Sequence, residues 1–292
     1  RGRSVTAMVT EPRYCPHRGF GRLPVSGSAF ARRGVAAALG AGAVIRTGVT
    51  ALDWAGPSPG DPHLGPLALE TVSPSGPETI TAKAVVLATG GRERPRSARL
   101  VAGTRPAGVF TGGELQQTVH LHRQTVGSRA VVIGAEQVGF AAVDTLSGAG
   151  VDVTAMVTER PRDGVAMLRR LNSRLRQGVP LLTDTSVTEL LGHGRLTGVR
   201  LRHRDGRTTT LPCDTIVFTG NFVPDHELAR RGGLDLDPQT HGPAVDAAFR
   251  TSRRGVFAVG GLLHAGASAA VAAREGRRAA HHVRAHLSAD SV

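Results

Sequence analysis

Residues 129–159 read RAVVIGAEQVGFAAVDTLSGAGVDVTAMVTE. The segment opens with an apolar run, Arg129–Ile133, turns at Gly134, and continues with helical periodicity over Gln137–Gly148. A second apolar run, Val151–Val157, follows another glycine-bearing turn. A strand, a helix and a strand in this order and at these lengths predict a βαβ unit with two parallel strands.

Seven residues of this segment occur twice in the chain. VTAMVTE stands at Val5–Glu11 and again at Val153–Glu159, so the chain contains two related units in which Glu11 corresponds to Glu159. Only Arg1–Ser4 precede the first copy. We therefore expect the first unit to be truncated at its N-terminus, without its opening strand, glycine turn and helix. A chain that opens on Arg is expected to be a processed form or a fragment.

The remaining segments repeat one order of elements. A helix is predicted at Ser28–Leu39, and a meander of short strands then ends in the buried run VVLATG, Val85–Gly90. After the βαβ unit, a helix is predicted at Val165–Gln177, and a second meander ends in VFTG, Val217–Gly220. A closing strand, GVFAVGG, and an Ala-rich helix from Ala265 to His286 finish the pattern.

This alternation predicts the α/β class, with two Rossmann-like three-layer domains whose parallel sheets are covered on both faces. The closing strand is expected to rejoin the first domain, so that the second domain is inserted in the first. The predicted bounds are 1–112 and 244–292 for the first domain and 113–243 for the second.

The composition of the chain indicates which kinds of partner it does not bind. The net charge is +13, but Lys83 is the only lysine and the arginines are scattered, which indicates coding bias and a solvated basic surface rather than a basic patch. Aromatic residues make up 3% of the chain, too few for base stacking. We expect no nucleic-acid partner. No apolar run approaches the ~18 residues of a membrane helix, and no leader is recognisable, so we expect no membrane partner.

The cysteines are Cys15 and Cys213, and the chain has no C-x-x-C or C-x4-C. A local redox dithiol and a zinc or iron–sulfur framework built from this chain alone are therefore excluded. The cysteine usage fits a reducing, cytoplasmic setting. His282 and His286 lie one helical turn apart, but no third ligand is evident, so no metal site is predicted. Cys15 and His17 are more simply a buried thiol and a loop imidazole than a reactive pair, and the catalytic residues are unknown.

The glycine turn after the first strand of a dinucleotide-binding unit lets a pyrophosphate approach the helix N-terminus, and a later acid holds the ribose. Here the turn keeps Gly134 and Gly139, carries Glu136 at the middle position, and is followed by Glu159 as the candidate ribose acid. A carboxylate at the middle position would repel phosphate. Two interpretations stay open: an altered NAD(P) site, or a Rossmann-type domain kept for its packing. Thr219 and Gly220, which end the second meander, are assigned to the same site.

Several segments carry a family resemblance: ATGGRERPR from Ala88, GVFTGGELQQ from Gly108, GNFVPDHELARRGGLDLDP from Gly220, TSRRGVFAVGGLLHAGASAAVAAREGR from Thr251 and YCPHRGFG from Tyr14. Together they resemble the pyridine nucleotide-disulfide oxidoreductase fold, the flavoproteins with two dinucleotide domains. Within that group the chain is most similar to the flavoprotein subunits of opine, hydroxyproline and related amine oxidases. The resemblance covers essentially the whole chain.

The resemblance implies an FAD-dependent oxidoreductase in which a C–N or C–H bond of a small substrate gives a hydride to the flavin. The expected cofactor is FAD, with NAD(P) as a candidate second one, and a second subunit or an electron acceptor is a candidate partner. Thr89 and Gly90 correspond to the Thr-Gly that packs near FAD, and Glu11 to its ribose acid. Gly260 and Gly261 stand where the family has Gly-Asp, so the acid that holds the ribityl chain is missing.

Two alternatives to the enzyme remain. One is a cofactor-poor scaffold or partner-binding subunit that retains the fold, and the other is a nucleotide-binding regulatory domain. An upstream reading frame that encodes a strand and G-x-G-x-x-G would favour the enzyme.

Overall fold

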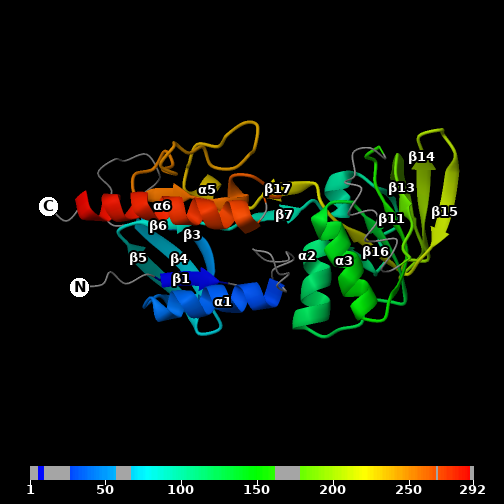
Figure 1. The fold of residues 1–292 in the computed structure, drawn as a ribbon, viewed down its shortest axis with the longest axis horizontal. Helices are drawn as coiled ribbons and strands as arrows, with labels where there is room; N and C mark the ends of the chain where they lie inside the picture. Colours follow the sequence, from blue (N-terminus) through cyan, green and yellow to red (C-terminus); the bar gives the residue numbers. More distant parts are fainter. Residues whose placement is uncertain (1–5, 10–26, 57–66, 162–177, 268, 290–292) are drawn as a thin grey trace. The chain divides into compact units, whose positions relative to one another are not determined.

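The structure is a computed structural model that describes residues 6–9, 27–56, 67–161, 178–267 and 269–289 (Figure 1). It divides into two compact units, of which unit 1 comprises Arg1–Arg92 and Phe222–Val292 and unit 2 comprises Glu93–Asn221. Unit 2 is one continuous segment between the two parts of unit 1, which is the order expected of a second domain inserted in the first.

The bounds of the compact units differ from the predicted ones at 112/113 and 243/244. Strand β9 (Val109–Thr111) pairs in parallel with β16 (Thr215–Phe218) and so belongs to the sheet of unit 2. Helix α5 (Glu227–Arg231) buries Ala229 in the core of unit 1. The packing partners of both segments are far away along the chain, so local sequence patterns do not assign the segments to a unit.

Unit 1 contains several small sheets and three helices among its described residues. Its elements are β1 (Thr6–Val9), α1 (Gly27–Gly40), β2 (Val44–Thr47), β3 (Thr50–Ala55), β4 (Leu67–Ser73), β5 (Gly76–Ala82), β6 (Val85–Leu87), β7 (Gly91–Glu93), β17 (Phe222–Pro224), α5, β18 (Val256–Ala258) and α6 (Ala269–Ala289). Strands β3, β4 and β5 form the predicted antiparallel meander, β18 pairs in parallel with β6, and β7 pairs with β17.

The described part of the first copy, Thr6–Val9, is a strand, as most of the second copy is. β1 pairs in parallel with β2, just as the second copy, in β11 (Asp152–Val157), pairs in parallel with its neighbour β10 (Arg129–Ile133). Helix α1 covers the predicted helix Ser28–Leu39. Glu11, Cys15 and His17, and the predicted helix Val165–Gln177, lie outside the described residues.

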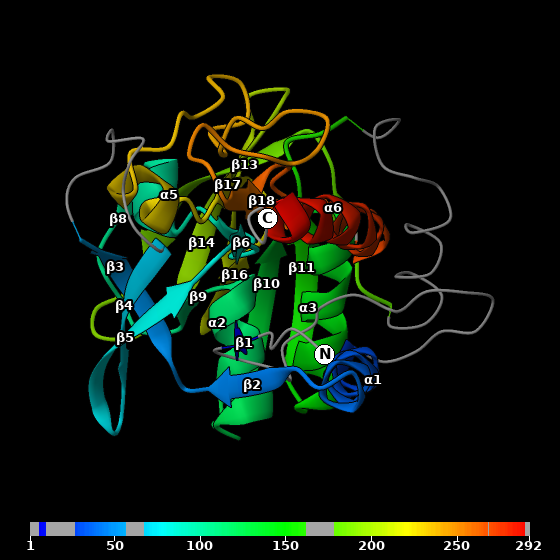
Figure 2. The ribbon, with the colours of Figure 1, turned by 90° about the vertical axis from the view of Figure 1, so that its left-hand side faces the viewer.

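The closing helix α6 packs over β6 and β18 (Figure 2), where Ala279 shares one apolar core with Val85 and Val256. We expected this helix to begin at Ala265, but it is described from Ala269. The preceding Gly266 has a φ of 85°, a left-handed conformation that helical geometry does not accommodate. Among the described residues, no helix combines the length and the apolarity that a membrane crossing requires.

Unit 2 is built on a five-stranded parallel sheet. Across the sheet the strands run β12 (Leu181–Leu182), β11, β10, β16 and β9. Helix α3 (Gln137–Gly148) joins β10 to β11 with the predicted bounds. The predicted βαβ unit is therefore confirmed, and the carboxyl ends of its strands lie at one edge of the sheet.

The two faces of this sheet are covered by different layers. Ala130 and Val132 pack on α3, where they meet Leu146, whereas Val131 and Ile216 face a core with the meander. This alternation is the period of two expected of a strand. The meander consists of β13 (Thr185–Leu191), β14 (Gly198–His203) and β15 (Thr208–Pro212), with β8 (Ala102–Gly103) parallel to β13. The three layers confirm the predicted α/β fold class.

The segment between β9 and β10 forms a short helix whose winding changes along its length. Helix α2 (Gly112–Gln116) begins at a capping box formed by Thr111 and Glu114, and a π-helical turn, Gln117–Leu121, follows it. The N–H of His122 donates to the carbonyl oxygen of Gln117 at 3.0 Å. That bond spans five residues, which is the π-helical spacing.

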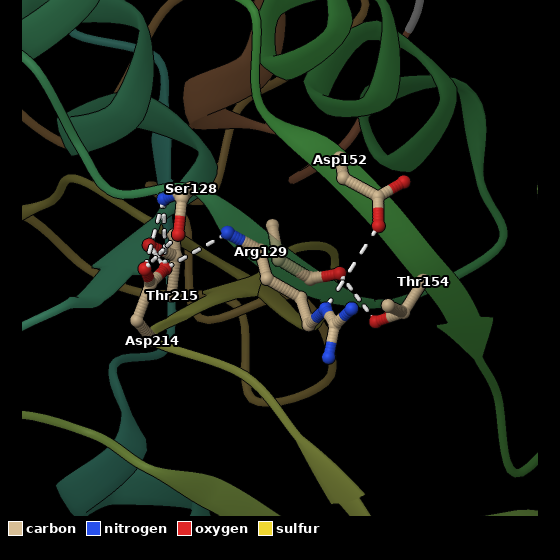
Figure 3. A network of polar contacts seen from close by, with 7 residues as sticks. Ser128, Arg129, Asp152, Thr154, Asp214 and Thr215 are labelled. Carbon is tan, nitrogen blue, oxygen red and sulfur yellow. Dashed lines mark hydrogen bonds and ion pairs between the residues drawn. The ribbon is translucent and has the colours of Figure 1, made fainter.

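One carboxylate ties together the starting ends of β10 and β16 (Figure 3). Asp214 accepts hydrogen bonds from the N–H of Ser128 at 2.9 Å, the hydroxyl of Ser128 at 2.6 Å and the N–H of Arg129 at 3.0 Å. The hydroxyl of Thr215 donates to it at 2.9 Å. This network fixes the end of the sheet opposite to the Gly134 turn, so the carboxyl ends of the strands are left for the candidate site.

Candidate nucleotide-binding sites

The glycine turn of unit 2 requires glycine at both ends. Gly134 has a φ of 129°, and its N–H donates to the carbonyl oxygen of Val157 at 2.8 Å. A β-carbon on Gly139 would lie 2.7 Å from the carbonyl oxygen of Gly134, so α3 can approach the turn this closely only without a side chain there. The local geometry is that of a phosphate loop.

Glu136 fills the space over this turn. It is the N-cap residue of α3, with extended backbone angles, but its side chain makes no capping hydrogen bond. A β-carbon on Gly134 would lie 2.6 Å from its Oε1, and a β-carbon on Gly220 would lie 2.9 Å from each of its carboxylate oxygens. The carboxylate thus lies against both glycines, and its buried Oε1 has no hydrogen-bond partner.

Thr219 and Gly220 bring the end of β16 to the same turn. The N–H and the hydroxyl of Thr219 both donate to the carbonyl oxygen of Ile133, at 2.8 and 2.9 Å. Gly220 has a φ of 68°, which glycine adopts at little cost. The structure therefore brings together five of the residues that the sequence assigned to this site: Gly134, Glu136, Gly139, Thr219 and Gly220.

The sixth, Glu159, follows β11. It lines a pocket of about 520 Å³ together with the turn and strand residues Asp184, Arg202 and Arg204. Its carboxylate lies within electrostatic range of Arg99. Its position after the second strand of the βαβ unit is the one from which an acid can reach a ribose.

Sequence reasoning missed a second acid at this edge. Glu93 is 7% exposed, and its buried Oε1 has no hydrogen-bond partner. A β-carbon on Gly112 would lie 2.5 Å from that oxygen. Burial raises the pKa of Glu93 and the charge of Glu136 raises it further, against hydrogen bonds from the N–H groups of Glu93 and Gly113 and the charge of Arg99. Only the folded chain places these two acids within range, so no local sequence signal identifies the pair.

Arg99 is the cation beside these acids, and it too was missed. Its Nε donates to the carbonyl oxygen of Arg94 at 2.7 Å, and its Nη2 donates to those of Thr219 and Gly220 at 2.9 and 2.8 Å. Its guanidinium lies 5.4 Å from the centre of the Phe218 ring. Arg99 therefore braces the backbone of the loop, and its charge acts on the acids from a distance.

In unit 1, the turns that follow β6 and β18 lie together. The hydroxyl of Thr89 donates to the carbonyl oxygen of Asp225 at 2.7 Å, and the N–H of Asp225 donates to that of Gly90 at 2.9 Å. A β-carbon on Gly261 would lie 3.4 Å from the Cα of Gly90. The turns assigned to FAD from the sequence are thus adjacent in space, with Gly90 and Gly260 both in the left-handed region.

The acid in this region comes from α6. Glu275 is 8% exposed, and its Oε2 accepts a hydrogen bond from the N–H of Gly260 at 2.8 Å. Its Oε1 lies 3.4 Å from Nε2 of His264. Sequence reasoning missed both residues, although Glu275 is the only acid in the Ala-rich stretch Ala265–His286. A single carboxylate in an Ala-rich helix could have pointed to this site from the sequence, because a buried carboxylate needs a hydrogen-bonding or charged partner.

The two cofactors fit these sites differently. At the unit 1 turns, Gly261 packs against Gly90, and a β-carbon on Gly90 would meet nothing within 4 Å, so the backbone at Gly90 is open to a planar group such as the flavin of FAD. In unit 2 the carboxylate of Glu136 fills the glycine cradle, and the loop in this conformation does not fit a pyrophosphate.

The described residues provide neither a reactive thiol nor a metal site. Cys213 is buried and unpaired, and burial raises the pKa of its thiol to about 12, with a further rise from the charge of Asp214. A thiol with this pKa is not a nucleophile at neutral pH. Across the described part of the chain, which includes His282 and His286, no three potential ligands gather as a metal site would require.

The three-layer unit with its glycine turn, joined to a second unit with paired glycine turns, defines an α/β protein of the FAD/NAD(P)-binding Rossmann-like class. Residues 60–276 match the family described as pyridine nucleotide-disulphide oxidoreductase. That match spans most of the chain, and the protein belongs to this family, whose members are FAD-dependent oxidoreductases that use FAD and NAD(P)H.

The relatives differ in function. The ferredoxin–NAD(+) reductase of the benzene 1,2-dioxygenase system of Pseudomonas putida is 32% identical over 199 residues, which cover 64% of this chain and 46% of that protein. A component of the opine oxidase of Rhizobium meliloti is 28% identical over 212 residues, covering 65% and 40%. The chain therefore spans less than half the length of these two relatives.

Solved structures support the fold. The thioredoxin reductase of T. acidophilum superposes with a TM-score of 0.71 at 24% identity, covering 89% of this chain and 80% of that one. An FAD-dependent pyridine nucleotide-disulphide oxidoreductase from Desulfovibrio vulgaris gives 0.63 at 21% identity, covering 97% and 71%.

Proposed function

We propose that the intact protein is an FAD-dependent oxidoreductase that takes a hydride from the carbon of a C–N bond in a small amine or N-substituted amino acid. The observation that carries this proposal is the pairing of the Gly90 and Gly261 turns beside the buried Glu275. Similarity to components of two Rhizobium meliloti enzymes favours this substrate class: the opine oxidase, and the sarcosine oxidase, whose matching chain is 29% identical over 155 residues.

We assign FAD to unit 1 and the second nucleotide loop to unit 2. When bound, FAD would supply the two-electron acceptor for the substrate hydride. The chain's own contribution is positional: the side-chain-free turns at Gly90 and Gly261 admit the flavin, and Glu275 holds the N–H of Gly260 so that its turn keeps one conformation. Glu11, which corresponds to Glu159 in the repeat, is our candidate for the FAD ribose.

The cysteines of this chain do not form a dithiol of the kind that reduces disulfides. The chain carries no C-x-x-C or C-x4-C, and Cys213 is buried with a raised thiol pKa. Electrons from a substrate would therefore leave the flavin for an acceptor other than a dithiol of this chain. A second subunit or a separate electron acceptor is the partner that this chemistry requires.

The test uses the full-length protein reconstituted with FAD. We expect a flavin absorbance band that bleaches anaerobically on addition of an opine, a cyclic imino acid or an N-methyl amino acid. Bleaching by NAD(P)H alone would identify a reductase and overturn the assigned substrate class.

A second candidate is a cofactor-poor scaffold or partner-binding subunit. Gly261 in place of the family's acid and Glu136 in the second loop favour it. Failure of the full-length protein to bind FAD under any reconstitution condition would establish this alternative in place of the enzyme.

A further inference from the structure

The glycine turn of unit 2 already holds a carboxylate of the chain, that of Glu136. The carboxylate of Glu136 lies against Gly134 and Gly220, so close that a β-carbon on either glycine would lie 2.6 to 2.9 Å from its oxygens. In a dinucleotide-binding unit, bare glycine is what allows the pyrophosphate to approach the backbone. A phosphate that contacted these two glycines would occupy the place that the carboxylate already holds.

The position suits a negative charge. Glu136 is the N-cap residue of α3, a twelve-residue helix, and the aligned peptide dipoles favour an anion at this end. Its Oε1 is buried without a hydrogen-bond partner, and both carboxylate oxygens lie against the glycines of the loop. The helix end that would attract a phosphate thus already carries a carboxylate of the chain itself.

The residues around Glu136 do not favour the binding of a second anion. Glu93, 7% exposed, adds another carboxyl within electrostatic range of Glu136. The cation of this edge, Arg99, donates from its Nε and Nη2 to three backbone carbonyl oxygens. A pyrophosphate would therefore meet two acids beside a guanidinium whose Nε and Nη2 already donate to the loop backbone.

We propose that Glu136 occupies the phosphate position of unit 2 and excludes NAD(P) from this loop, so that the protein exchanges electrons with an acceptor other than a nicotinamide nucleotide bound there. The exclusion rests on unit 2 alone. Only the statement about the acceptor rests on the proposed function.

Binding of NADH, NADPH and ADP-ribose to the full-length protein tests this by calorimetry. We expect no saturable binding to the wild-type protein at millimolar concentrations. Glu136→Gly, which removes both the charge and the bulk at a position where glycine is an acceptable N-cap, should tighten binding by about tenfold or more. Glu136→Gln keeps the shape without the charge and should gain less than the glycine variant.

A matched control is Glu189→Gln, which removes a carboxylate that pairs with Arg200 on the meander; it should leave nucleotide binding unchanged. Tight binding by the wild-type protein, or no gain in folded Glu136→Gly, would overturn the proposal. Equal gains in nucleotide affinity for Glu136→Gln and Glu136→Gly would contradict the claim that the bulk of the Glu136 side chain, and not only its charge, excludes the nucleotide. FAD content, measured on the same samples, separates a failure of the proposed function from a failure of this inference.

Discussion

The carboxylate of Glu275, in the closing helix, accepts a hydrogen bond from the backbone N–H of Gly260 at 2.8 Å, and both groups are buried. The two residues are fifteen positions apart along the chain. The bond joins the turn after β18 to α6, and so links the turn that we assign to FAD with the helix that packs over it.

Removal of this carboxylate should weaken unit 1. Glu275→Ala leaves the buried N–H of Gly260 unpaired, which costs about 1–3 kcal/mol. Glu275→Gln keeps an acceptor and should cost less. Urea unfolding followed by the fluorescence of Trp54, the single tryptophan of the chain, which packs against the unit 1 core, measures the effect.

The control for this comparison is Glu70→Ala, on an exposed position of β4, which should change stability by less than about 0.5 kcal/mol. If FAD binds as proposed, its dissociation constant should rise in Glu275→Ala more than in Glu275→Gln. Equal stability of both Glu275 variants and the wild type would show that the hydrogen bond to Gly260 contributes nothing.

Asp214 should make unit 2 sensitive to acid. Burial raises the pKa of this carboxyl, but hydrogen bonds from the hydroxyl of Ser128, from the N–H groups of Arg129 and Ser128 and from the hydroxyl of Thr215 outweigh it, and the pKa falls to about 2. Because the folded pKa is below the unfolded one, the stabilisation is complete above about pH 4 and is lost as the pH falls toward 2.

After a discount for solvent screening, we expect this carboxylate to contribute about 1–2 kcal/mol at neutral pH. The unfolding free energies of the wild type and of Asp214→Asn, measured from pH 3 to pH 7, should therefore converge as the pH falls. A difference that stays constant with pH would contradict the assigned pKa.

Gly139 should not tolerate a side chain. A β-carbon there would lie 2.7 Å from the carbonyl oxygen of Gly134, so Gly139→Ala forces α3 away from the turn and should cost about 1–3 kcal/mol. Gly148→Ala, at the other end of the same helix, meets nothing within 4 Å and should stabilise by about 0.5–1 kcal/mol. Opposite shifts in melting temperature are expected, and equal shifts would contradict this account of the turn.

The thiol of Cys213 should be inert in the folded protein. It is 4% exposed, and its pKa is raised to about 12 by burial and by the charge of Asp214. In the Cys15→Ser variant, Cys213 is the remaining cysteine, and Ellman's reagent at pH 8 should detect a thiol only after urea is added. Rapid reaction without urea would mean that the site opens readily.

Local sequence patterns were sufficient for the frame of unit 2. Apolar runs of strand length on either side of a helical period placed β10, α3 and β11, and the two glycines of the turn could be read directly. The meanders and the insertion of unit 2 in unit 1 also followed from the order of the elements. The domain bounds did not, because β9 and α5 owe their membership to partners remote in the chain.

The sequence by itself determined the fold class, the Gly134 turn and the presence of an acid in that turn, because backbone periodicity and glycine conformation are local properties. Only the tertiary structure decided that the carboxylate of Glu136 lies against Gly134 and Gly220, that Glu93 and Arg99 join it, and that Glu275 holds the N–H of Gly260. Those relationships arise from folding, which brings side chains that are distant in the sequence to one buried place, where charges and hydrogen-bonding groups act on one another strongly.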